Sequence, residues 1–126
     1  MLKQFQIDGS NIKSLDDFYD EISRVLIPNV FWGRNLDAFD DILGGGFGTP
    51  DEGFVIRWSN SAASRNGLGY SQTVRELEVR LNNCHPSNRS KVQSEIELAK
   101  QSLGPTAFDW LIDIIDDHPD IILRLE

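Results

Sequence analysis

The 126-residue sequence is poor in cysteine, in basic residues and in long apolar stretches. Its single cysteine, Cys84, excludes an intramolecular disulfide and any metal site built from several cysteines. No stretch reaches the roughly 18 apolar residues that a membrane-spanning helix needs, and polar residues follow Met1 and Leu2 too soon for a signal peptide. These absences predict a cytoplasmic protein without membrane contact.

The shortage of basic residues leaves the chain strongly acidic. Twelve Lys and Arg stand against twenty Asp and Glu, which gives a net charge of −8. This sign is opposite to that of a protein that binds a phosphate backbone, so it argues against direct nucleic-acid binding and favours a basic partner. The charge is uneven, because residues 57–100 hold seven basic and four acidic side chains, a net +3, while both ends are acidic.

The apolar content, 40% of residues with 10% aromatic, is sufficient for a hydrophobic core, and the length predicts a single domain over residues 1–126. Alternation and β-forming residues predict strands near 2–7, 54–58 and 121–125, and helical periodicity predicts helices near 15–26, 36–43, 73–82, 88–103 and 108–115. Residues 59–72 are predicted to be a polar loop. Strands separated by helices imply parallel pairing and a small α/β fold, and the apolar run at 54–58 predicts burial on both sheet faces.

The predicted helix at 36–43 carries an unusual group of charges. Asn35 is its expected N-cap, and its apolar residues fall on one side, opposite Asp37, Asp40 and Asp41. Like charges at these spacings cost about 0.2–0.5 kcal/mol each, so folding alone does not require the arrangement. The three aspartates are either a solvated helix face or a surface whose counter-charges come from another molecule. The second interpretation predicts that this chain supplies no local counter-ions to them.

Several stretches together resemble the barstar family of intracellular ribonuclease inhibitors. They are the first strand, the helix closed by Pro28, the run Phe31-Trp32-Gly33-Arg34-Asn35-Leu36-Asp37-Ala38, the strand ending in Trp58 and the last helix and strand. The resemblance covers about residues 1–58 and 105–126 and leaves 59–104 as an enlarged helical segment. It implies a three-stranded parallel sheet packed with helices, and an inhibitor that occludes the active site of a ribonuclease or related basic toxin.

The resemblance also implies which residues contact the nuclease. Asp37 and Asp41 match two helix carboxylates that contact its cationic, phosphate-binding groups, and Asp40 adds a third charge beside them. The other matched contacts lie before the helix, at its end and on the last helix: Phe31, Gly33, Asn35, Gly44, Gly45 and Asp113. No catalytic residue, cofactor or metal is implied.

The sequence departs from the family pattern at three of these positions. Phe31 lacks a phenolic hydroxyl, Asp40 stands in place of a tryptophan and Asp113 in place of a glutamate. These departures and the unmatched middle support a second hypothesis, in which the chain is a barstar-like interaction module that uses segment 57–100 to bind a partner other than a ribonuclease. The oligomeric state stays open in both hypotheses.

Enzymatic interpretations have weaker support. Asp37 and Asp41 could act as an acid–base pair, but nothing in the sequence places them in a cleft that would separate their pKa values. A magnesium site would need a second acidic motif opposite the first. Adjacent residues such as Cys84 and His85 rarely face each other as nucleophile and base, and the glycines at 44–48 lack the Lys-Ser/Thr of a phosphate loop. We therefore expect no catalytic activity.

Overall fold

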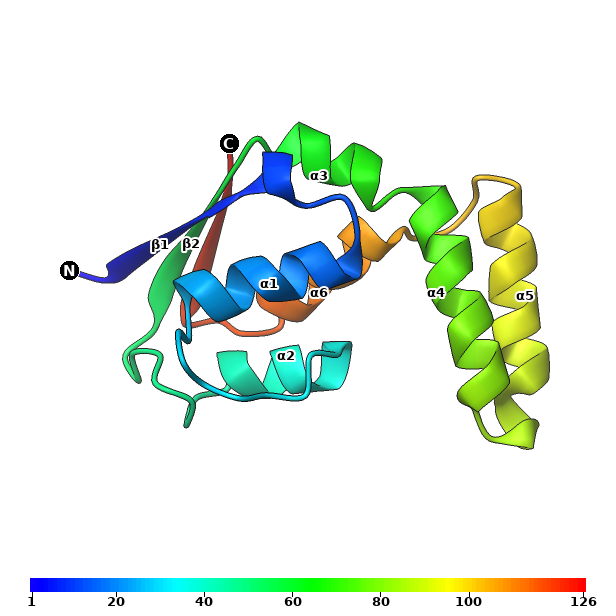
Figure 1. Cartoon of the computed structure of the whole chain (residues 1–126), viewed down its shortest axis with the longest axis horizontal. Helices are drawn as coiled ribbons and strands as arrows, with labels where there is room; N and C mark the ends of the chain where they lie inside the picture. The colour runs from blue at the N-terminus through cyan, green and yellow to red at the C-terminus, as the bar shows by residue number, and fades with distance from the viewer.

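Three parallel strands in the order β1-β2-β3 form the sheet of the computed structural model, which describes residues 1–126 (Figure 1). The strands are β1 (Lys3–Asp8), β2 (Phe54–Ser59) and β3 (Ile121–Leu125), and the helices are α1 (Leu15–Val25), α2 (Leu36–Leu43), α3 (Ser61–Gly67), α4 (Tyr70–Asn83), α5 (Arg89–Lys100) and α6 (Ala107–Asp116). Two 3-10 turns lie at Gly9–Asn11 and Pro86–Asn88. The predicted α/β fold with a small parallel sheet is confirmed.

The two faces of the sheet differ in what covers them. Phe5 pairs with Ile56 in register, and both point into the core beneath the helices. On the other face Gln4 and Ile122 flank Val55, and both of these neighbours are exposed. Val55 itself is buried although it lies outside the core cluster. The predicted burial of β2 on both faces is therefore correct for Val55 but not for the sheet as a whole.

Side-chain caps fix where the core helices begin. Ser14 accepts a hydrogen bond from the backbone N–H of Asp17 at 3.1 Å and starts α1. Thr106 and Asp109 form a reciprocal capping box at the start of α6. Each cap satisfies backbone N–H groups that have no partner inside the helix, which is worth about 1 kcal/mol.

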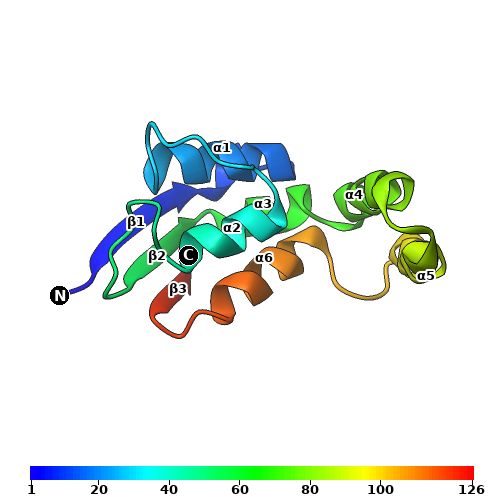
Figure 2. The same ribbon diagram turned by 90° about the horizontal axis from the view of Figure 1, so that it is seen from below.

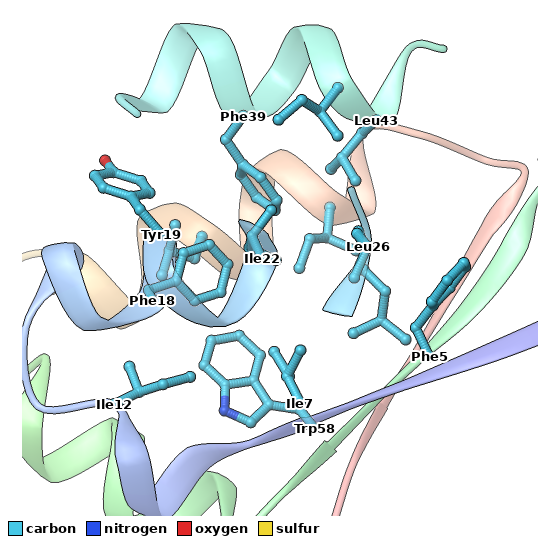
Figure 3. Packing of buried hydrophobic residues seen from close by; sticks show 14 of the residues in the cluster. Phe5, Ile7, Ile12, Phe18, Tyr19, Ile22, Leu26, Phe39, Leu43 and Trp58 are labelled. Atoms are coloured by element: carbon cyan, nitrogen blue, oxygen red, sulfur yellow. The ribbon is translucent and has the colours of Figure 1, made fainter. Parts of the chain in front are cut away.

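A chain of aromatic contacts connects the helices to the sheet. Phe18 on α1 lies with its ring centroid 5.0 Å from Phe39 on α2 and 5.4 Å from Trp58 on β2 (Figure 3). Trp58 continues the chain to Phe108 on α6 at 5.2 Å. All four rings are buried, and each buried phenylalanine contributes about 1.5–3 kcal/mol of transfer free energy. This packing holds α2 in a fixed orientation on the domain.

The helices α4 and α5 form a hairpin at the side of the sheet and its covering helices (Figures 1 and 2). They enclose a small apolar cluster of their own, made by Leu77, Val92, Ile96 and Ala99. Trp110 on α6 packs against this cluster and against the main core, so it connects the hairpin to the rest of the molecule. The helices predicted at 73–82 and 88–103 are confirmed, with α4 starting earlier and α5 ending earlier.

The loop predicted at 59–72 is wrong, because this segment contains α3 and the first turn of α4. Ser and Ala make up four of the seven residues of α3, and its sequence has no apolar periodicity that would predict a helix. A polar residue anchors it instead: the fully buried Ser64 accepts a hydrogen bond from Nε1 of Trp58 at 2.8 Å and donates one to the carbonyl of Gly9 at 3.0 Å.

Replacing Ser64 with Ala would leave the indole N–H of Trp58 buried without a partner, while the carbonyl of Gly9 would keep only its bond from the N–H of Ile12. We expect this variant to lose about 1–3 kcal/mol of unfolding free energy, measured by urea denaturation. Ser94→Ala is the matched control, because the Ser94 hydroxyl bonds only to a carbonyl of its own exposed helix and its loss should change stability little. Equal stability of the two variants would contradict the anchoring role of Ser64.

Candidate partner-binding site

Helix α2 presents its charges outward because of its cap and its packing. The side-chain oxygen of Asn35 accepts a hydrogen bond from the N–H of Ala38 at 2.7 Å, as the predicted N-cap should. The apolar residues Phe39, Ile42 and Leu43 are buried, whereas the aspartates at 37, 40 and 41 are exposed. The predicted division of this helix into an apolar and an acidic side is confirmed.

Two of the three aspartates have no counter-ion within the chain. The ion pairs of the structure are Arg24–Glu21, Arg34–Asp20, Arg57–Glu126 and His118–Asp40. Arg34 directly precedes the helix cap, yet its guanidinium turns toward α1, where it lies 2.7 Å from Asp20. Asp37 and Asp41 are therefore left as uncompensated negative charges on one exposed side of α2.

Asp40 differs from its two neighbours. Its carboxylate lies 2.6 Å from Nε2 of His118, in the turn between α6 and β3. The expectation that all three aspartates lack local counter-groups is therefore wrong for Asp40, whose charge is offset whenever the imidazole is protonated. Sequence reasoning missed this contact, because the two residues are 78 positions apart and no motif connects them.

In the loop before α2, the ring of Trp32 is buried and the ring of Phe31 is exposed. Trp32 is buried, and its Nε1 donates a hydrogen bond to the hydroxyl of Ser23 on α1 at 2.7 Å. Phe31, one residue earlier, is fully exposed at 101%. Gly33 follows, and a Cβ atom there would come within 3.2 Å of the Ala38 Cβ. Trp32 thus anchors the loop and leaves Phe31 available for contact.

The remaining matched positions lie at the end of α2 and on α6. Gly44 is the C-cap of α2, and its N–H bonds to the carbonyl of Asp40. Gly45 has φ of +104°, a conformation that favours glycine, and no atom lies within 4 Å of a Cβ built there. Asp113 is exposed on α6, the helix that lies beside α2 (Figure 2). Gly44 and Gly45 are consecutive in the chain, and no hydrogen bond or ion pair joins either of them to Asp113.

Sequence reasoning also missed a groove between α2 and α4. It has a volume of about 490 Å³ and is lined, among others, by Asn35, Leu36, Asp37, Glu76, Val79, Arg80 and Trp110. Burial, and secondarily the charge of Asp16, raise the pKa of Glu76 above its ordinary value. The sequence did not predict that α4 lies beside α2, because this position depends on the packing of Trp110 against the two apolar clusters.

Two of the enzymatic alternatives, a metal site and a pair formed by Cys84 and His85, can be compared with the positions of the side chains. No group of three or more His, Cys, Asp or Glu side chains could hold a metal ion. The thiol of Cys84 points to the carbonyl of Leu81 at 3.6 Å, whereas His85 bonds to the hydroxyl of Ser87. Cys84 and His85 therefore do not form a nucleophile and base pair. None of the helices combines the length and apolar character needed to cross a membrane.

A comparison with protein families identifies the chain. The family model described as Barstar (barnase inhibitor) matches residues 2–83. The chain belongs to the barstar family. The match includes residues 59–83, which the sequence analysis left outside the resemblance, and it ends before α6 and β3, which the analysis included. No curated protein matches the chain.

The missing counter-ion of Asp41 can be tested through stability. Asp41 lies near the C-terminus of α2, where the helix dipole disfavours a negative charge, so Asp41→Asn should raise the unfolding free energy by about 0.3–1 kcal/mol at low salt. Asp40→Asn is the matched comparison on the same turn, because it also removes the negative charge that faces His118 and should give a smaller gain or a loss. Urea denaturation of both variants provides the measurement, and destabilisation by Asp41→Asn would show that Asp41 has a partner within the chain.

Proposed function

We propose that this chain binds a barnase-type ribonuclease and occludes its active site, so that it protects the cytoplasm of the cell that makes it. The observation that carries the proposal is the pair of uncompensated carboxylates at Asp37 and Asp41 on a rigidly packed helix. The family supports the same kind of partner, because its description is that of a barnase inhibitor.

The mechanism follows from the chemistry of a ribonuclease active site. Such a site must bind phosphate groups, so it presents cationic side chains. Asp37 and Asp41 are one helical turn apart, about 6 Å along the axis, and can therefore meet two such cations at once. The carboxylates gain counter-charges that their own chain does not provide, and the body of α2 blocks the entry of RNA.

The other matched residues have supporting roles in this proposal. Phe31 contributes exposed apolar area that is lost from water on binding. Gly33, Gly44 and Gly45 keep the backbone accessible at both ends of α2, and Asn35 holds the helix start. Asp113 adds a further negative charge from α6, and Asp40 contributes charge that His118 offsets when protonated.

Most cations of the net positive segment 57–100 are held by contacts within the chain, although only Arg57 is in an ion pair. Four of its seven cations are engaged within the chain: Arg57 pairs with Glu126, Arg65 and Arg80 lie over the rings of Phe108 and Trp110, and Arg89 donates to the carbonyl of Leu81. The acidic side of α2 is therefore the better supported docking surface, and we retain the ribonuclease as the partner.

The proposal predicts stoichiometric inhibition of barnase, measured by the cleavage of a fluorogenic RNA substrate at increasing inhibitor concentration. Asp37→Asn and Asp41→Asn should each weaken inhibition by about thirtyfold or more, which is the effect of losing a central contact worth about 2 kcal/mol. Glu97→Gln is the charge-matched control, since Glu97 is exposed on α5, and it should inhibit like the wild type.

Two results would contradict this account. RNA cleavage that continues unchanged in a large excess of the wild-type chain would overturn the proposed function. Hydrolase activity of the chain alone that disappears in Asp37→Asn would replace inhibition by an enzymatic role.

A further inference from the structure

The groove between α2 and α4 extends the acidic surface of α2 onto the helical hairpin. Asp37 belongs to both, because it projects from the first turn of α2 and also lines the groove. Glu76 lines the groove from α4. We propose that this groove receives an arginine or lysine side chain of the inhibited ribonuclease, with its charged group held by Asp37 and Glu76. This inference rests on the proposed function and identifies a second contact for the same partner.

Glu76 is a partly buried carboxylate that has no counter-ion within the chain. Its carboxylate accepts one side-chain hydrogen bond, from Nε2 of Gln72 at 3.2 Å, and it belongs to none of the ion pairs of the structure. Burial raises its pKa, followed by the charge of Asp16, although Arg80 and Arg75 lower it. The chain's own arginines therefore offset only part of the cost of this half-buried charge, and a cation from the partner would offset more of it.

The two other ionisable groups that line the groove are a neutral phenol and a guanidinium that is held against a ring. Burial raises the pKa of Tyr19, so its phenol stays neutral at physiological pH. The guanidinium of Arg80 lies 5.2 Å from the ring centroid of Trp110, over which it is placed by a cation–π contact. Arg80 thus belongs to the wall of the groove rather than to an ion pair with Glu76.

The shape and apolar lining of the groove suit a long basic side chain. Leu36 and Trp110 are half-buried at its walls, and Val79 is 54% exposed on α4. Lysine and arginine bury their aliphatic stems on apolar surface while the charged end stays in a polar environment. The groove has apolar walls and two carboxylates against the one guanidinium of Arg80, so it matches a basic side chain better than a neutral or an acidic one.

The charge contact can be tested with Glu76→Gln, which keeps the shape of the side chain. We expect its dissociation constant for barnase, measured by isothermal titration calorimetry, to rise by at least about fivefold, because a desolvated charge contact is lost. Glu78→Gln is the matched control on the same helix, since Glu78 is exposed and does not line the groove, and it should bind like the wild type. The thermal midpoint of Glu76→Gln should not fall, because its carboxylate has no ion pair to lose.

The apolar contact has a separate test in Val79→Ser. Because Val79 is 54% exposed, we expect the variant to fold and to bind barnase more weakly, whereas Leu98→Ser, at an exposed position of α5 that does not line the groove, should have no effect. If Asp41→Asn weakens binding while Glu76→Gln and Val79→Ser leave it unchanged, the groove is not a contact and only this inference is overturned. If the wild-type chain does not bind barnase, the proposed function fails and this inference fails with it.

Discussion

Burial of the apolar side of α2 is the constraint on which the candidate site depends. Phe39 packs edge to face against Phe18, which in turn contacts Trp58 in the central strand, so the helix cannot turn about its axis without breaking a continuous aromatic core (Figure 3). With this side fixed, Asp37 and Asp41 must face solvent. The repulsion between them is a small cost compared with the burial of one phenylalanine, about 0.2–0.5 against 1.5–3 kcal/mol. The packing of the core therefore fixes Asp37 and Asp41 on the surface, although the repulsion between them slightly destabilises the fold.

The positions of the cationic side chains also leave Asp37 and Asp41 without counter-ions. Arg34, the basic residue next to the site in the sequence, is held by Asp20 on α1, and Arg80, which lines the adjoining groove, stacks on Trp110. Only Asp40 has a local counter-group, in His118. Cationic side chains thus lie close to the acidic side of α2 without neutralising it at Asp37 or Asp41. Unpaired carboxylates at Asp37 and Asp41 are what the proposed binding of a basic ribonuclease requires.

The sequence was sufficient for the parts of the fold that depend on periodicity and local chemistry. The alternation around Phe5 and the apolar run from Phe54 predicted strands, and the spacing of Leu36 and Phe39 after Asn35 predicted α2 with its cap. The sequence did not predict how segments that are far apart in the chain lie against one another. Helix α3 depends on the buried hydroxyl of Ser64, and its sequence has no apolar pattern.

The candidate site was likewise predicted only in part from the sequence. The orientation of the three aspartates followed from the helical period, but the pairing of Asp40 with His118 depends on how the last helix ends beside α2. The groove at Glu76 depends on where the hairpin docks, and Trp110 contributes to this by packing against both apolar clusters. Contacts of this kind join residues that are far apart in the chain, and they cannot be identified from a single sequence.

The central claim is that uncompensated carboxylates on α2 attract a basic ribonuclease. The most direct measurement is the rate constant of association with barnase, followed by stopped-flow fluorescence over a range of ionic strength. Electrostatic attraction predicts a rate constant that falls steeply as salt is added, because screening acts on the long-range field that steers the encounter. An association rate that does not change with salt would contradict the account.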